Sequence, residues 1–305
     1  MKVNHKRSTS RFGGAQDMTT GSVVNKLVSL AIPVVLANLL QTAYQFIDTV
    51  WVGRVGPTAV AAVSLSFPIL FLMISLGGGL GIAGSILVAQ YQGRGDTEKV
   101  NEVAGQTITA MLFASIVVSV LGYHLSQPLI SLMVRNADAK LIADATLYLQ
   151  WTFIALPTLF LFFVFQSLMR GVGDVITPLF IVGGTVLLNL VLDPFFIFTL
   201  DMGVSGAAVA TLCTQTLAAL IGLWLLFTGR AGIQLTKCSL KPRLPILKKM
   251  FFLGLPASLE QSSRAFGITM MAFLVADYST NVVAAYGVGS RVLGFVIIPA
   301  LGLSM

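Results

Sequence analysis

The chain has 305 residues, of which 56% are hydrophobic and only 10% are charged, and its net charge is +7. A soluble domain carries about 25% charged residues, so this composition excludes a domain whose whole surface faces water. A mean hydropathy of +0.88 and long apolar segments without alternation favour an all-α polytopic membrane protein over a membrane barrel. The basic residues lie in the tail and short loops rather than on one soluble face, which argues against a nucleic-acid partner.

Residues 1–25 are polar and lack the short apolar core of a cleavable signal peptide. We predict a cytoplasmic tail there. A bilayer-spanning helix needs about 20 mostly apolar residues, and eight segments meet this requirement. In chain order they are Lys26–Val52, Ala59–Tyr91, Val103–Leu125, Ala145–Met169, Val175–Leu200, Ser205–Thr228, Leu247–Ala276 and Val282–Met305.

The distribution of Lys and Arg predicts the orientation, because cytoplasmic loops carry the excess of both. With the N-terminus inside, fourteen basic residues face the cytoplasm and three face outward. The outer three are Arg54, Arg135 and Lys140. The inner ones are Lys2, Lys6, Arg7, Arg11, Lys26, Arg94, Lys99, Arg170, Arg230, Lys237, Lys241, Arg243, Lys248 and Lys249. We therefore predict a multi-pass protein of the plasma or inner membrane with a cytoplasmic N-terminus.

A weak internal repeat divides the chain. Leu30-Ala31-Ile32-Pro33 resembles Leu253-Gly254-Leu255-Pro256, which lies 223 residues further along. A repeat of six spans predicts two parallel lobes related by an axis along the membrane normal. We predict a six-helix lobe over 26–229, a basic cytoplasmic linker over 230–246 and the first two spans of a second lobe over 247–305. Twelve spans are expected in the complete protein, so four spans of the second lobe are missing from this chain.

Acidic residues inside the predicted spans mark a candidate site. A carboxylate at bilayer depth costs about 2.5–3.5 kcal/mol on insertion scales, and such residues commonly face a bundle interior or a water-filled cavity. A rise of 1.5 Å per residue places Asp48 and Asp193 at similar depth in the outer half of the bilayer. Thr211 enters at the same level, and Asn189 lies one turn from Asp193. Two carboxylates, an amide and a hydroxyl favour binding of a proton or a hard cation.

Both acids also have a structural interpretation. Asp193 precedes Pro194 and could cap a helix break, and Asp48 could lie near the lipid headgroups. In the seventh span Glu260 and Arg264 are four residues apart, and we expect them to neutralise each other rather than form a second cation site.

Two prolines at equivalent repeat positions, Pro33 and Pro256, predict bends in the first and seventh spans. Arg291 in the eighth span needs a partner that the sequence does not identify. Gly77–Gly84 contains five glycines inside a span and predicts close helix packing rather than a phosphate loop.

Enzymatic motifs are absent from the sequence. It contains neither GxxxxGK[ST] nor HExxH nor GxSxG, and its only histidines are His5 and His124. Cys213 and Cys238 have no spacing typical of a disulfide framework or a metal site. We predict that the chain is not an enzyme and needs no cofactor apart from a coupling ion.

The residues resemble the multidrug and toxic compound extrusion (MATE) transporters. The resemblance covers the whole chain. It rests on Pro33, on the motifs Gln41-Thr42-Ala43-Tyr44-Gln45-Phe46-Ile47-Asp48-Thr49 and Gly93-Arg94-Gly95-Asp96, on Arg170-Gly171-Val172-Gly173-Asp174 with Thr177-Pro178, and on Asn189-Leu190-Val191-Leu192-Asp193-Pro194.

This resemblance implies twelve spans in two lobes around a central cavity, and exchange of a cationic or amphipathic drug for H⁺ or Na⁺. It implies that Asp48, Asn189, Asp193 and Thr211 hold the coupling cation, including Na⁺ if the protein is sodium-coupled. It also implies that Gln41 and Tyr44 line the substrate cavity and that the first span bends at Pro33 on protonation.

We therefore expect a secondary drug exporter that acts as a monomer in the bilayer on a small-molecule drug or toxic organic cation. A lipid-linked oligosaccharide flippase of the same superfamily is the first alternative, and it should have a more cationic cavity, for which only Arg264 and Arg291 are candidates. A non-transporting receptor or assembly subunit is the second.

Overall fold

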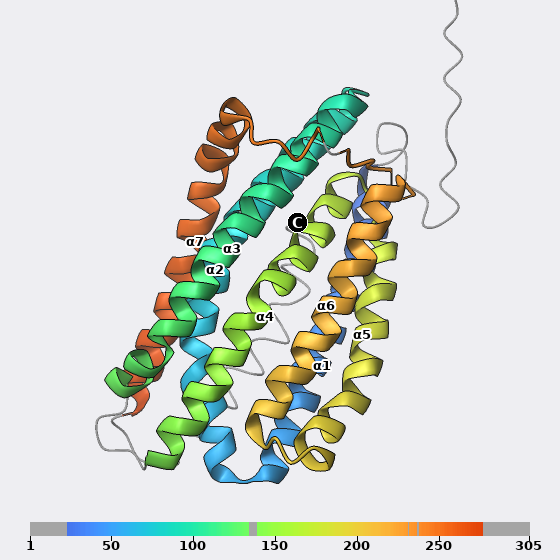
Figure 1. Cartoon of the computed structure of the whole chain (residues 1–305). Helices are drawn as coiled ribbons and strands as arrows, with labels where there is room; N and C mark the ends of the chain where they lie inside the picture. The colour runs from blue at the N-terminus through green and yellow to red at the C-terminus, as the bar shows by residue number, and fades with distance from the viewer. Residues whose placement is uncertain (1–22, 134–138, 231, 237, 277–305) are drawn as a thin grey trace, which may run out of the picture.

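The computed structural model describes residues 23–133, 139–230, 232–236 and 238–276, and all regular structure in these residues is helical. The helices form one elongated bundle (Figure 1). They are α1 (Val23–Val55), α2 (Pro57–Gly93), α3 (Thr97–Met133), α4 (Ala139–Gly171), α5 (Ile176–Pro194), the short π-helix η1 (Phe195–Thr199), α6 (Val204–Thr228) and α7 (Leu244–Ala276).

Among the described residues, six helices are long and apolar enough to cross a membrane, and they correspond to the first six predicted spans. The all-α membrane fold is thus confirmed. The seventh predicted span forms the 33-residue helix α7, which is not among the six because charged residues interrupt its apolar sequence. The eighth predicted span, with Arg291, lies outside the described residues.

Several helices are longer than predicted. Helix α3 has 37 residues, which at 1.5 Å per residue is about 55 Å, whereas the hydrocarbon core is about 30 Å thick. Its first turn lies beyond the predicted start at Val103 because the Asp96 carboxylate accepts a hydrogen bond from the backbone N–H of Lys99 and caps the helix.

The core is organised around α4, which packs against α2, α3 and α6. In Figure 1, α4 lies between α2, α3 and α7 on one side and α1, α5 and α6 on the other. Phe153, Leu156, Phe160, Phe165 and Leu168 of α4 are all buried in the main apolar cluster. This apolar packing leaves the polar residues of α1, α5 and α6 on the other side of the bundle.

The glycines of α2 permit close helix contacts, which confirms the packing interpretation of that segment. A methyl group at Gly79 would overlap the carbonyl oxygen of Gly254 in α7. The reverse also holds, since a Cβ atom on Gly254 would lie 2.6 Å from the carbonyl oxygen of Gly79. Gly77 and Gly84 face Phe160 of α4 and Thr107 of α3 in the same way. Helix α2 therefore contacts three neighbours at short range.

The turns between α2 and α3 and between α4 and α5 share one geometry. Gly95 has φ +73° and Gly173 has φ +83°, values that favour glycine. In each turn the following Asp caps the next helix: Asp96 accepts from the N–H of Lys99 and Asp174 from the N–H of Thr177, at 3.1 and 3.0 Å. Both glycine-aspartate motifs are thus explained by the local backbone.

The linker between α6 and α7 is hydrogen-bonded to α3. Gln106 is fully buried, and its Nε2 donates to the carbonyl oxygens of Ser239 and Lys241 at 2.9 and 2.7 Å. Its Oε1 accepts from the backbone N–H of Arg243 at 2.7 Å. One side chain of α3 therefore holds three backbone groups of the predicted linker.

Other residues of α3 contribute to the same attachment. These contacts join Asn101 to the N–H of Gln234, Thr109 to the carbonyl oxygen of Leu240, and Glu102 to the guanidinium of Arg243. The linker is thus fixed to the first lobe by side chains on consecutive turns of α3.

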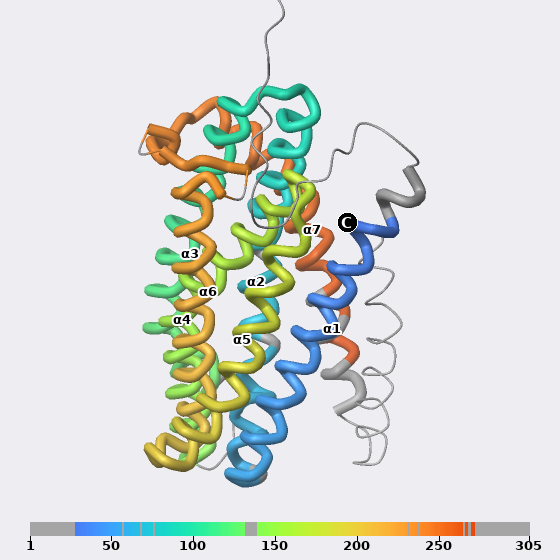
Figure 2. Tube along the Cα trace, turned by 90° about the vertical axis from the view of Figure 1, so that its right-hand side faces the viewer, coloured from blue at the N-terminus to red at the C-terminus, as the bar shows by residue number. Residues whose placement is uncertain are grey.

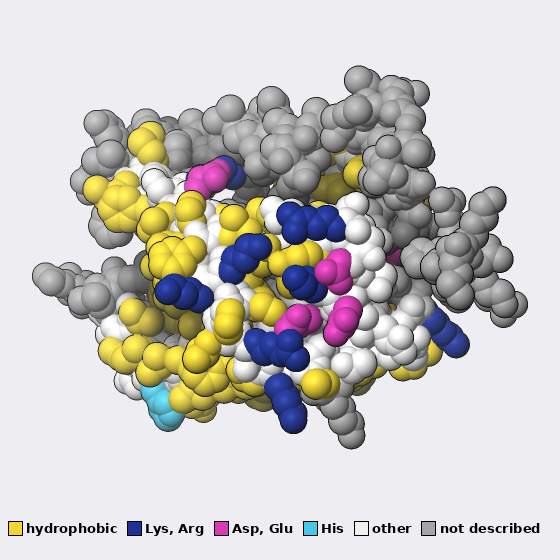
Figure 3. Space-filling model, turned by 90° about the horizontal axis from the view of Figure 1, so that it is seen from above, with side chains coloured by type: hydrophobic (Ala, Val, Ile, Leu, Met, Phe, Trp, Pro, Cys, Tyr) yellow, Lys and Arg dark blue, Asp and Glu magenta, His cyan; other side chains and the backbone are white. Residues whose placement is uncertain are grey.

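Basic side chains gather at one end of the bundle (Figure 3). The α2–α3 turn, the linker and the start of α7 supply Arg94, Lys99, Arg230, Lys241, Arg243, Lys248 and Lys249, all exposed. Arg54 and Lys140 lie at helix ends that face the opposite way. The charge asymmetry of the loops is therefore an asymmetry between two faces of the structure.

Pro33 and Pro256 lie inside the continuous helices α1 and α7. Neither helix is broken at its proline, so the bends remain predictions. The expected pairing in α7 is confirmed, because Arg264 Nη2 lies 2.9 Å from Glu260 Oε1. Both cysteines are free, as expected.

Candidate cation site

The two acids predicted to act together come from neighbouring helices. Helices α1 and α5 pack against each other and run side by side in Figure 2. Asp193 in α5 is fully buried, and Asp48 in α1 is partly buried. The two carboxylates are close enough to interact electrostatically. The structure thus places both acids in one region, as their matched depth predicts.

Several buried polar atoms of this region lack a close hydrogen-bond partner, although the Asn189 side chain lies near the Asp193 carboxylate. Within the described residues, buried side-chain atoms without a partner include Asp48 Oδ1, both oxygens of Asp193, and the amide oxygen and nitrogen of Asn189. Buried polar groups in proteins are nearly always paired, and a lone buried carboxylate is especially unfavourable. Five such atoms on three adjacent side chains leave oxygens available to hold a proton or a metal cation.

Tyr44 and Thr211 join the site from two further positions. Their hydroxyl oxygens lie 2.6 Å apart and share a hydrogen bond between α1 and α6. Tyr44 lies one turn before Asp48 on α1, near both acids. Thr211 is therefore joined to the residue one turn before Asp48, and its role as a cation ligand stays a prediction. Tyr44 is buried, so it belongs to this polar cluster, whereas a role in lining a substrate cavity stays a prediction.

Tyr148 of α4 is a site residue that the sequence did not reveal. It lies near Asp48, Tyr44 and Asp193, and it packs against the small apolar cluster around Val52. The only available signal was a hydroxyl-bearing aromatic residue within an apolar span. Gln41, in contrast, is exposed and is not part of this cluster.

A π-helix begins immediately after Asp193 and Pro194. Proline has no N–H to donate, and the chain continues through η1 instead of ending α5 at a capped break. Single π-helical turns occur frequently at functional sites. Phe198 of η1 packs edge-on against Trp51 of α1, with ring centroids 6.2 Å apart. The Trp51–Phe198 contact thus joins η1 to α1 just beyond the two acids.

Taken together, these features define a polytopic helical membrane protein with a buried, incompletely paired polar site. Its sequence matches the MatE family model over residues 33–195. The chain therefore belongs to the MATE family.

Curated relatives carry drug-export names. "Probable multidrug resistance protein YpnP" of Bacillus subtilis is 31% identical over 291 residues, which cover 94% of this chain and 64% of that protein. "Multidrug export protein MepA" of Staphylococcus saprophyticus is 26% identical, covering 92% and 62%. The chain thus spans slightly less than two thirds of the length of these relatives.

Solved structures agree in fold. A MOP superfamily transporter from Pyrococcus furiosus has a TM-score of 0.86 and 29% identity, covering 93% of this chain and 63% of its own. A MATE structure in a bent conformation gives a TM-score of 0.84 at the same identity and coverage.

Proposed function

We propose that this chain works in a secondary active transporter that exports cationic or amphipathic compounds in exchange for H⁺ or Na⁺. The observation that supports it most is the group of unpaired polar atoms on Asp48, Asn189 and Asp193. Drug-resistance names among the relatives favour a drug-like substrate.

The chemistry of the site supports cation coupling. Two adjacent carboxylates repel each other when both are charged, and a bound cation removes this repulsion. Carboxylate, amide and hydroxyl oxygens suit Na⁺ and can equally hold a proton. Asp48, Asn189, Asp193 and Thr211 would be the ligands, and Tyr44 would orient the Thr211 hydroxyl.

Exchange requires that cation and substrate favour different conformations. In this proposal the cation neutralises Asp48 and Asp193 and allows α1 and α5 to pack tightly. Substrate binds the form in which the acids are charged. Each bound species then lowers the affinity for the other, so that inward cation movement drives export.

We also propose an orientation in the membrane and an oligomeric state. The basic face lies in the cytoplasm because that side carries the excess of Lys and Arg, and the protein works as a monomer in the plasma or inner membrane. The flippase alternative requires unpaired cations in a cavity. Arg264 instead pairs with Glu260, which favours the drug exporter over the flippase, and the other candidate, Arg291, lies outside the described residues.

The test is drug flux by the chain reconstituted in liposomes. A cationic dye should move against an imposed H⁺ or Na⁺ gradient, and Asp48→Asn and Asp193→Asn should each abolish this flux. Asp201→Asn is the matched control, since Asp201 is exposed and outside the site. Unchanged flux in both site variants, compared in the full-length transporter that contains this chain, would refute the proposal.

A further inference from the structure

Three basic side chains, two from the α2–α3 turn and one from α7, lie around one aromatic ring. The guanidinium carbon of Arg94 lies 5.8 Å from the centre of the Tyr91 ring, and Lys99 Nζ lies 5.3 Å from it. Lys249 Nζ of α7 lies 5.5 Å from the same centre. A ring face attracts a cation, but three cations around one ring also repel one another.

No carboxylate of the described residues forms an ion pair with these three cations. The ion pairs found there join Arg243 to Glu102 and Arg264 to Glu260. Asp96 is near, but its Oδ1 accepts the backbone N–H of Lys99 and caps α3. The three cations around Tyr91 therefore have no direct ion-pair partner, and an anion placed there would relieve their mutual repulsion.

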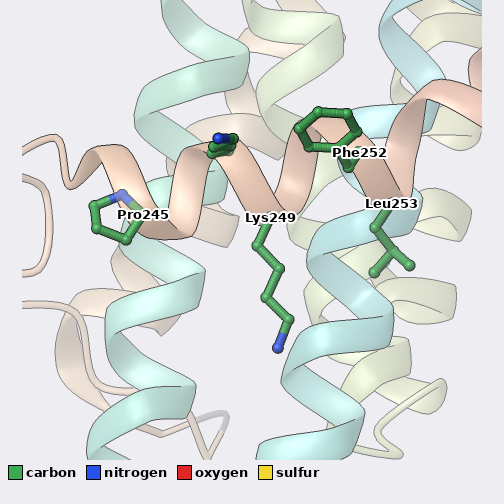
Figure 4. A pocket seen from close by; sticks show the side chains of 5 residues that line it. Pro245, Lys249, Phe252 and Leu253 are labelled. Atoms are coloured by element: carbon green, nitrogen blue, oxygen red, sulfur yellow. The ribbon is translucent and has the colours of Figure 1, made fainter.

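An apolar pocket adjoins this charge. Lys248 and Lys249 line a pocket of about 480 Å³ with Pro245, Phe252 and Leu253. Figure 4 shows Lys249 extending away from α7, with Phe252 and Leu253 further along the helix. Phe252 is 63% exposed. The pocket therefore combines ammonium groups with an uncovered apolar wall.

A second, larger groove begins beside Lys248. It has a volume of about 780 Å³ and lies between α3 and α7, where Phe113, Ala114, Leu247 and Phe251 line it. Phe113 is 72% exposed. Lys248 lines both hollows, so one ammonium group borders the apolar groove as well as the charged pocket.

We propose that the basic cluster, defined as Arg94, Lys99, Lys248 and Lys249, binds the phosphate of an anionic phospholipid whose acyl chain occupies the groove between α3 and α7. A phosphate matches the unbalanced charge. An acyl chain matches a long apolar groove on a membrane helix, which a free phosphate ion would leave uncovered. The lipid belongs to the leaflet on the side of the basic face.

The lipid would connect two parts of the protein. Arg94 and Lys99 lie at the α2–α3 turn of the first lobe, whereas Lys248 and Lys249 lie at the start of α7. A bound headgroup therefore stabilises the arrangement in which α7 approaches α2. This effect is independent of the cation site and requires no transport activity.

The test is lipid binding by the purified full chain in detergent, measured by native mass spectrometry and by thermal unfolding. Dioleoyl phosphatidylglycerol should bind saturably and raise the melting temperature, whereas dioleoyl phosphatidylcholine and inorganic phosphate should not. Lys248→Gln with Lys249→Gln should weaken phosphatidylglycerol binding by about fivefold per lysine. Arg230→Gln with Lys241→Gln removes the same charge from the same face and should change the affinity less than twofold.

A separate variant tests whether the acyl chain binds in the groove between α3 and α7. Ala114→Phe fills the groove and should weaken dioleoyl phosphatidylglycerol binding while leaving the dihexanoyl form unaffected. Equal losses in the two charge-removal variants would show nonspecific attraction and overturn the proposal. So would equal binding of phosphatidylcholine, or equal stabilisation by inorganic phosphate, which would reduce the cluster to an anion site.

Discussion

The hydroxyl groups of Tyr44 and Thr211 form a hydrogen bond of 2.6 Å that joins α1 to α6 beside the two buried acids. Tyr44→Phe removes this bond and leaves the Thr211 hydroxyl without its partner. We expect the free energy of unfolding to fall by about 1 kcal/mol, measured by denaturant titration in mixed micelles. Tyr123→Phe is the control because Tyr123 is exposed. Equal losses in both variants would contradict a specific role for the bond.

Asp193→Asn should stabilise the protein while removing its response to cations. Both carboxylate oxygens of Asp193 are buried without partners, and burial of an unpaired charge is costly. In sodium-free buffer at pH 8 we expect the amide to raise the free energy of unfolding by about 1 kcal/mol.

The cation response is measured by thermal unfolding. Binding to the folded state stabilises it, so the unmodified chain should melt at a higher temperature when Na⁺ is added or the pH is lowered from 8 to 6. Asp193→Asn should show neither increase, and Asp201→Asn should keep the response. A full response in Asp193→Asn would exclude this carboxylate as a cation ligand.

Gly79→Ala should weaken the contact between α2 and α7. The added methyl group overlaps backbone atoms of Gly254 that cannot rotate away, and overpacking costs about 1–3 kcal/mol. Gly184→Ala in α5 meets no atom within 4 Å and should instead stabilise its helix by up to about 1 kcal/mol. Thermal unfolding compares the two. A neutral Gly79→Ala would mean that α7 can move away from α2 freely.

Gln106→Leu should release the linker from α3. The substitution removes three hydrogen bonds to linker backbone groups and leaves those groups unpaired. Trypsin should then cleave after Arg230 or Arg243 at least tenfold faster, as followed by gel electrophoresis. Gln90→Leu is the control because Gln90 is exposed on α2. Unchanged cleavage would show that the linker does not depend on Gln106.

The fold was largely predictable because each helix that crosses the bilayer needs about 20 mostly apolar residues. Long apolar segments give the first six spans, and Asp48 and Asp193 were recognisable as acids at matched depth. Helix ends were less predictable, since the polar first turn of α3 leaves the hydrocarbon and depends on the Asp96 cap.

Contacts between segments far apart in the chain could not be predicted from the sequence. Tyr148 lies near the acids only because its side chain reaches from α4 to the apolar cluster around Val52, and nothing in its neighbours along the chain indicates this. Likewise, Gln106 meets Lys241 across 135 positions. A buried glutamine requires hydrogen-bond partners, but the sequence alone does not identify the backbone groups that provide them.

The attachment of the linker to α3 has a mechanical consequence. Gln106, Thr109 and Asn101 hold the carbonyl and N–H groups of this segment. The segment is therefore rigid and does not act as a hinge. A change in the angle between α7 and α3 must therefore come from bending within α7 itself. Pro256 lies in this helix and lacks the N–H that would otherwise brace the preceding turn.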